Sequence, residues 1–253
     1  QELDRANVYY VLCSTNSSYI PDCITAKNFR ILKIIAPSNK IQALATRIYE
    51  LFLSKWFRHV VKPDVLFSFH NLKSPHFPFA KKNIGSILDL IPIILEDYAT
   101  SGDHSQQVYK KRYEETIKLC DKFMAISEYS KKDAVKLLGI NKELIRVIPL
   151  SVESNFKVLG TSETAKVKKK YNLPNQFVLT IGGNEPRKNV IKVVESYEKL
   201  SEQLRAQYPL VIIGGGWRGR SLEPLEKEYT RILGFVDDDD LPAIYNLASC
   251  FVF

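Results

Sequence analysis

Two adjacent cations, Arg187 and Lys188, follow a glycine pair and precede a predicted helix in the second half of the chain. The stretch from 180 to 189 reads TIGGNEPRKN. Glycines let a ligand approach the backbone closely, and the start of a helix offers unpaired N–H groups and the positive end of its dipole. Two more positive charges at that end are unfavourable unless an anion balances them, as a diphosphate would. Solvated cations in an ordinary loop are the alternative interpretation.

Two other apolar runs in the same half also end in glycine. Residues 211–217 read VIIGGGW, and residues 231–238 read RILGFVDD. The carboxyl ends of parallel strands meet at one edge of an α/β sheet, and ligands bind outside that edge. Each glycine turn alone is a weak signal, but the three together favour a shared nucleotide site.

Three polar residues follow predicted strands in the first half of the chain. Asp89 closes the run SILD, where it either faces a cleft at the sheet edge or makes an Asx turn or helix cap. His70 also ends a strand, and a loop histidine with satisfied hydrogen bonds is favoured over a catalytic one. Ser127 is expected to cap the helix that follows it, with contact to a ligand as the alternative.

Short apolar runs alternate with stretches of helical period along most of the chain. This alternation predicts parallel α/β sheets with right-handed crossovers. Strands are predicted at 8–13, 29–35, 65–69, 84–88, 123–126, 145–148, 177–181, 210–213, 231–233 and 250–253. Helices are predicted at 41–61, 105–120, 130–138, 189–204 and 241–248.

A break in the apolar pattern after Pro149 predicts two domains. Residues 151–176 are polar and include the run KVKKK, so we expect a linker there, between a domain of residues 1–150 and one of residues 177–253. The chain opens without methionine and closes on an apolar strand predicted to be buried, whose partner helix would be missing. We therefore expect that the N-terminus is not the natural one and that the second domain is truncated at its C-terminus.

The composition is that of a globular protein: of 253 residues, 45% are hydrophobic and 25% charged. No run of 18 apolar residues is present, which argues against a membrane-spanning helix. The net charge of +8 is concentrated in residues 1–150, which carry 22 Lys and Arg against 15 Asp and Glu; the remainder carries 14 against 13.

This uneven charge either marks an anionic partner, such as a membrane surface or a lipid-linked phosphate, or is an ordinary solvated excess. The predicted helix at 41–61 could touch an anionic membrane through a wide apolar face beside Arg47, Lys55 and Arg58. Packing of this helix within its own domain is favoured. Nucleic acid is disfavoured as a partner, because the basic residues are not interleaved with aromatic ones.

The four cysteines show no metal-binding spacing. Cys13, Cys120 and Cys250 lie in or beside apolar runs, so we expect them to be small core residues. A reducing cytosol is the natural compartment for such thiols.

At this point the chain resembles the retaining, metal-independent glycosyltransferases of family 4, in the mannosyltransferase-like branch that builds bacterial O-antigen, capsule and exopolysaccharide. The matching segments occur in the family's order, and the pairing of EPRKN with LGFV and LPAIY is fairly specific. These segments are LDLIP (88–92), FMAISEYS (123–130), RVIP (146–149), GNEPRKN (183–189), LGFV (233–236) and LPAIY (241–245). The resemblance implies the GT-B fold, an α/β architecture of two Rossmann-like domains.

The resemblance also implies roles for the candidate residues. Arg187 and Lys188 would hold the donor diphosphate and stabilise the charge that develops on the leaving nucleotide. With these cations in place of a metal, no metal or other cofactor is expected, and the acidic run at 237–240 would not be a metal site. Asp89 remains a candidate carboxylate without an assigned step. The turns near the phosphates and the base would be formed by Gly182, Gly183, Gly234, Phe235 and Val236.

The implied reaction is transfer of a sugar from a UDP- or GDP-linked donor to a glycan or lipid-linked acceptor, with retention, in the cytoplasm or at the inner face of the membrane. The acceptor would approach near Asp89, His70 and Ser127. Leu88 departs from the family, which often has a sugar-contacting histidine there. The resemblance also implies that the first domain lacks the family's first strand, before Gln1, and that the family's Glu-x7-Glu element would begin only after residue 253. A non-catalytic nucleotide- or glycan-binding module is therefore an alternative, and an epimerase or phosphorylase of the same fold matches EPRKN less well.

Overall fold

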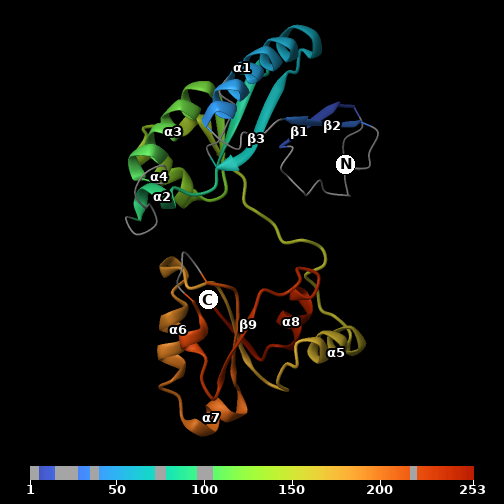
Figure 1. Cartoon of the computed structure of the whole chain (residues 1–253), viewed down its shortest axis with the longest axis vertical. Helices are drawn as coiled ribbons and strands as arrows, with labels where there is room; N and C mark the ends of the chain where they lie inside the picture. Colours follow the sequence, from blue (N-terminus) through green and yellow to red (C-terminus); the bar gives the residue numbers. More distant parts are fainter. Residues whose placement is uncertain (1–5, 15–27, 35–39, 72–77, 96–104, 217–220) are drawn as a thin grey trace. The chain divides into compact units, whose positions relative to one another are not determined.

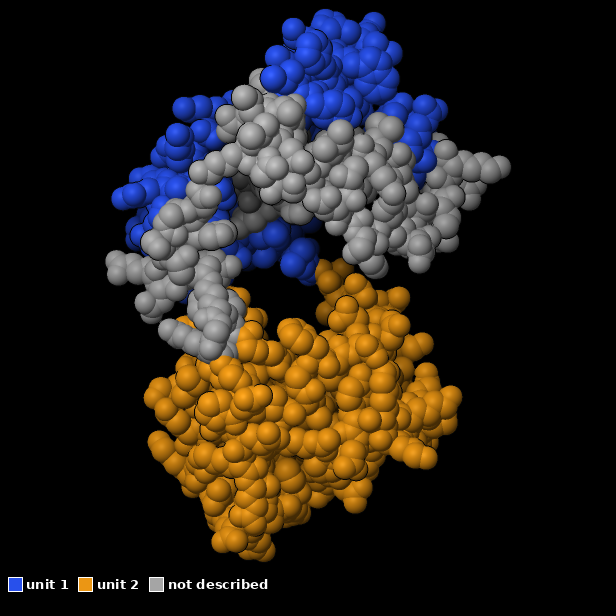
Figure 2. Space-filling view, viewed as in Figure 1, with its two compact units in different colours: residues 1–150 blue, residues 151–253 orange. Residues whose placement is uncertain are grey.

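The computed structural model describes residues 6–14, 28–34, 40–71, 78–95, 105–216 and 221–253. The chain divides into two compact units, residues 1–150 and residues 151–253 (Figure 2). Each unit has a parallel sheet and its own hydrophobic core. The α/β architecture expected from the alternating pattern is therefore confirmed.

The second unit is built on four parallel strands in the order β10-β7-β8-β9. In Figure 1, helix α6 lies on one side of this sheet, and helices α5 and α8 lie on the other. The strands are β7 (Val178–Ile181), β8 (Leu210–Ile213), β9 (Thr230–Gly234) and β10 (Cys250–Val252). The helices are α5 (Thr161–Lys170), α6 (Val190–Tyr197), α7 (Glu202–Gln207) and α8 (Leu241–Leu247).

Strand β8 explains why both faces of this sheet are covered. All four of its residues are buried, and they alternate between two hydrophobic clusters. Val211 and Ile213 pack with residues of α5 and α8, whereas Leu210 and Ile212 pack with residues of α6. Successive strand residues point to opposite faces, so a continuous apolar run needs a helix on each side.

One phenol joins several elements of the second unit at the end where β8 and β9 begin. The hydroxyl of Tyr197 lies 3.1 Å from the carbonyl oxygen of Arg205, 3.0 Å from that of Tyr208 and 3.2 Å from that of Tyr229. A hydroxyl has one proton, so it donates to one of these acceptors at a time. Burial raises the pKa of Tyr197, which keeps that proton in place.

The first unit contains a four-stranded parallel sheet in the order β3-β4-β5-β6 and a separate parallel pair, β1-β2. Its core is formed by residues of β4, β5 and β6 with helices α3 and α4. The strands are β1 (Tyr9–Ser14), β2 (Phe29–Ile34), β3 (Val65–Asn71), β4 (Lys82–Ile87), β5 (Lys122–Ala125) and β6 (Ile145–Val147). The helices are α1 (Lys40–Trp56), which continues as the π-helical turn η1 (Phe57–Val61), α2 (Ile91–Ile94), α3 (Gln106–Leu119) and α4 (Glu128–Leu138). Among the residues described, no helix has the length and apolarity needed to cross a membrane.

Three local expectations differ from the structure. The helix predicted at 189–204 is two helices, because Ser201 caps α7 by accepting a hydrogen bond from the N–H of Leu204 at 3.4 Å. The linker predicted at 151–176 contains α5, which packs against α8 through Val167. Strand β10 is a half-exposed edge strand, and Cys250 is exposed where a core residue was expected. Composition does not distinguish an edge strand from a central one.

Candidate functional site

The order of strands in the second unit defines a switch point beside β7. The chain runs from β7 to β8 and β9 on one side and then returns to place β10 on the other side of β7. The strands that follow β7 in the chain thus lie on both sides of it, and open α/β sheets bind ligands in the crevice at such a point. The stretch that contains Gly182, Gly183, Arg187 and Lys188 follows β7 directly. The strongest sequence candidates therefore lie where this topology favours a ligand.

Three glycine turns meet at the carboxyl ends of β7, β8 and β9. The N–H of Gly182 donates to the carbonyl of Ile213, and the N–H of Gly214 donates to the carbonyl of Gly234, both at 2.8 Å. A Cβ on Gly214 would lie 2.5 Å from the carbonyl oxygen of Gly182, and a Cβ on Gly183 would lie 2.7 Å from that of Gly215. These backbones come together only because the residues are glycines.

Phe235 stands at the third of these strand ends. Gly234 turns the chain with a φ of +71°, and the ring of Phe235 then lies against Gly215, where a Cβ would come within 2.5 Å of it. The Phe235 side chain is nevertheless 86% exposed. Val236 differs, because it packs against the hydrophobic cluster of α5 and α8. Of this pair, Phe235 is the side chain available to a ligand.

The two cations have different partners. They belong to a single 3-10 turn, Pro186–Lys188, and the following Asn189 adopts a left-handed conformation at the start of α6. Arg187 makes a two-point ion pair with Glu185, with Nε 2.9 Å from Oε1 and a terminal nitrogen 3.2 Å from Oε2. The Lys188 Nζ lies 5.1 Å from the centre of the Phe253 ring. An anion at this turn would meet the full charge of Lys188 and would share or displace Glu185 at Arg187.

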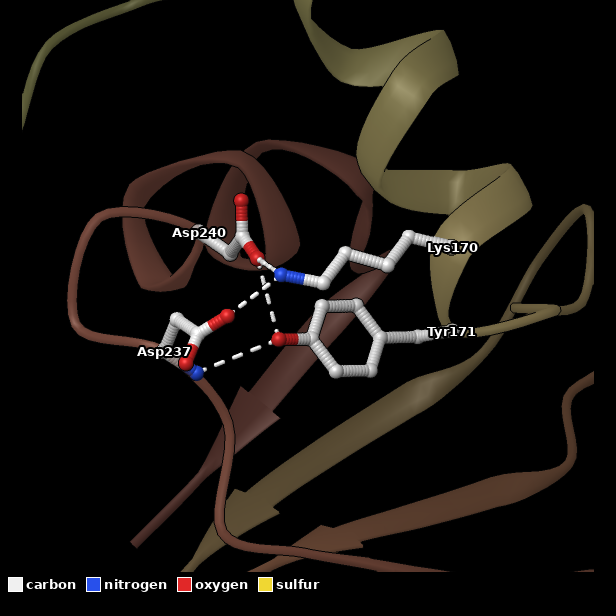
Figure 3. Close-up of polar contacts among 4 residues, drawn as sticks. All are labelled: Lys170, Tyr171, Asp237 and Asp240. Carbon is white, nitrogen blue, oxygen red and sulfur yellow. Dashed lines mark hydrogen bonds and ion pairs between the residues drawn. The ribbon is translucent and has the colours of Figure 1, made fainter.

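The acidic turn after β9 is tied to the end of α5 (Figure 3). Lys170 forms ion pairs with the carboxylates of Asp237 and Asp240. Tyr171 donates a hydrogen bond to Asp240. Sequence reasoning missed Lys170 and Tyr171, because their partners lie more than sixty residues away and only the folded chain brings them together. Within the described part of the chain, no three His, Cys, Asp or Glu side chains gather as a metal-binding group.

The three candidates of the first unit have local structural contacts or lie outside the described side chains. The Ser127 hydroxyl caps α4 by accepting a hydrogen bond from the N–H of Ser130 at 3.1 Å, the favoured interpretation. The Asp89 carboxylate accepts a hydrogen bond from the N–H of Ile91 at 3.1 Å, an Asx turn at the start of α2. His70 lies near the end of β3, and its side chain is outside the described residues. Because β4 and β5 are neighbours, Asp89 and Ser127 follow adjacent strand ends.

Residues 161–253 match the family model described as "Glycosyl transferases group 1". The second unit is therefore a group 1 glycosyltransferase domain, and the fold of the chain is that of GT-B glycosyltransferases. The resemblance to the family 4 type, stated on sequence segments above, is confirmed. The fold is also seen in the crystal structure of Anabaena Alr3699/HepE in complex with UDP and glucose, with a TM-score of 0.61 and 14% identity over 88% of this chain and 59% of that one.

Two curated relatives, both from Escherichia coli, are mannosyltransferases. The serotype-specific mannosyltransferase WbdA is 29% identical over 175 residues, which are 65% of this chain and 21% of the relative. The O-antigen chain mannosyltransferase B is 30% identical over 151 residues, 57% of this chain and 40% of the relative. The chain thus matches less than half the length of either relative.

Proposed function

We propose that this protein transfers a sugar from a nucleotide diphosphate sugar to a hydroxyl of a glycan or lipid-linked acceptor, with retention, during synthesis of a cell-surface polysaccharide. One observation carries the proposal: a group 1 domain has its glycine turns and two cations together at the switch point of its sheet. The curated relatives are named as mannosyltransferases of O-antigen synthesis, which favours mannose as the sugar. The Anabaena neighbour holds UDP and glucose, which supports a nucleotide-linked donor.

In this reaction the bond between the anomeric carbon and the phosphate oxygen breaks, the acceptor hydroxyl oxygen forms the new bond to that carbon, and the proton of the hydroxyl passes to the departing diphosphate. Negative charge develops on the departing diphosphate. Lys188 and Arg187 would stabilise that charge. His70 and Ser127 remain acceptor-side candidates, and Asp89 remains a candidate catalytic carboxylate to which no step is assigned.

The proposed reaction is expected to proceed without a divalent metal. Two fixed cations replace the charge that Mg²⁺ would supply to a diphosphate, so turnover should persist in EDTA. The experiment incubates the protein with a panel of UDP- and GDP-sugars and a glycan primer, and it follows nucleotide release and the anomeric configuration of the product by NMR. Activity that is lost on chelation and restored by Mn²⁺ would contradict the metal-free step. An inverted product would contradict retention.

A non-catalytic binding module is the second candidate, and Leu88 favours it. Leu88 stands where the related enzymes often have a sugar-contacting histidine, and its backbone carbonyl accepts a hydrogen bond from the Ser130 hydroxyl at 2.8 Å. The same panel separates the two candidates. A binding module would bind a nucleotide sugar in calorimetry but release no nucleotide with any acceptor.

We also propose that α1 and η1 contact an anionic membrane surface. Ile48, Phe52, Trp56 and Val60 recur at every fourth position, and their side chains are between 46% and 66% exposed. Cations lie beside the C-terminal end of this segment, where Arg58, Lys62 and Lys81 line a shallow cavity together with Pro63. Apolar side chains beside cations are the combination that binds an interface rich in anionic lipid.

Replacing Phe52 and Trp56 together with serine is expected to lower the affinity for anionic vesicles by about tenfold or more, because two large apolar side chains no longer insert. Flotation with phosphatidylglycerol vesicles measures this. Tyr129→Ser is the matched control, since Tyr129 is an exposed aromatic residue elsewhere in the first unit. If the unmodified protein, the double variant and Tyr129→Ser all float equally, this surface does not bind the membrane. If the unmodified protein binds neutral vesicles as well as anionic ones, the proposed preference for anionic lipid is wrong.

A further inference from the structure

Lys170 and Tyr171, at the C-terminal end of helix α5, both contact the turn that follows β9 (Figure 3). The Lys170 Nζ lies between the carboxylates of Asp237 and Asp240, 2.6 Å from Oδ2 of Asp240. The Tyr171 hydroxyl donates a hydrogen bond to that same oxygen at 2.9 Å and accepts one from the backbone N–H of Asp237 at 3.1 Å. Both ends of the 237–240 segment are thus bound to Lys170 and Tyr171.

The residue that follows Tyr171 also contacts β9 itself. The Arg231 guanidinium donates a hydrogen bond to the carbonyl of Asn172, the next residue along. Residues 170–172 therefore contact both the strand and the turn that leaves it. This arrangement fixes the direction in which the chain exits β9.

Lys170 also offsets a repulsion that the turn would otherwise suffer. Four consecutive carboxylates at 237–240 repel one another, and the ammonium group lies between two of them. The two carboxylates raise the pKa of Lys170, and the hydrogen bond from Lys170 lowers the pKa of Asp240. The ion pairs are partly exposed, so their value lies in geometry more than in stability.

The held turn contains Phe235, the exposed ring at the glycine-lined site. Apart from its chain neighbours, Gly234 has no atom within 4 Å of the position that its Cβ would occupy, so in this turn only Val236 packs against the cluster of α5 and α8. On one side the turn is fixed by the hydrogen bond from the N–H of Gly214 to the carbonyl of Gly234. On the other side it is fixed by the contacts of Asp237 and Asp240 with α5. The position of the Phe235 ring depends on both attachments.

We propose that Lys170 and Tyr171 are positioning residues that hold the 234–237 turn in the shape that receives the nucleoside of the donor. This inference rests on the proposed function, in which the donor is a nucleotide sugar. The cations after β7 serve the diphosphate, and the turn after β9 serves the base and ribose. Loss of the α5 contacts therefore weakens recognition of the nucleoside and leaves recognition of the diphosphate intact.

The experiment compares the affinities of UDP, GDP and inorganic pyrophosphate for the intact protein and for three variants, by calorimetry or by competition. Tyr171→Phe removes only the hydroxyl and keeps the ring that packs against the core cluster. Lys170→Met removes the charge and keeps most of the length of the side chain. Lys169→Met is the matched control, because it removes an exposed lysine one residue away.

We expect Tyr171→Phe and Lys170→Met each to weaken binding of the preferred nucleotide by about fivefold or more, and to change pyrophosphate affinity by less than about twofold. Lys169→Met should change neither. Hydrogen exchange provides the second measurement, with faster exchange in Lys170→Met confined to residues 233–241.

Unchanged nucleotide affinity, or an equal loss for nucleotide and pyrophosphate, would overturn the inference, since the latter is what a general structural defect produces. Unchanged exchange of the turn would overturn it as well, even if a variant binds too weakly for calorimetry. If the unmodified protein binds neither UDP nor GDP, the proposed function fails and takes this inference with it. If the unmodified protein binds a nucleotide and both variants bind it equally well, only the role of Lys170 and Tyr171 fails.

Discussion

Lys188→Ala should weaken binding of the donor nucleotide by about tenfold or more, because a charge-assisted contact with phosphate contributes about 1.5–3 kcal/mol. The ammonium of Lys188 lies over the ring of Phe253 and is not held by a carboxylate in the described contacts, so a diphosphate can engage its full charge. Turnover should fall at least as far as affinity, since the charge of the diphosphate grows as the sugar departs.

Calorimetry with UDP and GDP, followed by steady-state kinetics, measures both effects of Lys188→Ala. Lys199→Ala is the control, since Lys199 is an exposed lysine of the same unit that lies beyond the end of α6. If Lys188→Ala and Lys199→Ala bind nucleotide as tightly as the unmodified protein, Lys188 has no phosphate to hold. The proposal that the turn after β7 is a diphosphate site would then be abandoned.

Gly214→Ala should be among the most destabilising single changes in the second unit, at about 3 kcal/mol or more. Gly214 has a φ of +137°, and an added Cβ would lie 2.5 Å from the carbonyl oxygen of Gly182. That oxygen belongs to the backbone at the end of β7, so it cannot rotate away as a side chain would. The strain would separate the ends of β7 and β8 and disturb nucleotide binding together with stability.

The free energy of unfolding, measured in urea by far-UV circular dichroism, tests this prediction. Gly234→Ala is the matched control, because Gly234 also has a positive φ but no atom within 4 Å of the added Cβ. It should cost only about 1–2 kcal/mol, the conformational penalty of a left-handed alanine. Equal losses for the two variants would mean that the close approach of the strand ends does not constrain Gly214.

Much of the fold could be predicted from local pattern. Strands such as 210–213 are continuous apolar runs, and a run of that kind has one good solution, a central parallel strand covered on both faces. Ser127 was predictable as a cap because the preference of serine for that position is local and general. The exposed edge position of β10 was not predictable, since exposure depends on which strand the chain places outside it.

The candidate site divides in the same way. The glycine turns and the two cations were predictable, because each is a short segment at the end of a recognisable strand. The pairing of Glu185 with Arg187 was overlooked although the two are only two residues apart, and it leaves the turn with one balanced cation and one available cation. The contacts of Lys170 with Asp237 and Asp240 could not be predicted, because the basic run looked like a linker and nothing local links it to the acidic turn.

The hydroxyl of Tyr197 joins α6 to the residues just before β8 and β9. The glycine turns lie at the opposite ends of these two strands. The three carbonyl neighbours of the hydroxyl are main-chain atoms, so these contacts do not depend on which side chains those neighbours carry. Substitutions in the loops at the glycine end of the sheet therefore leave these contacts unchanged, so the proposed donor site can be altered while the opposite end keeps β8 and β9 attached to each other.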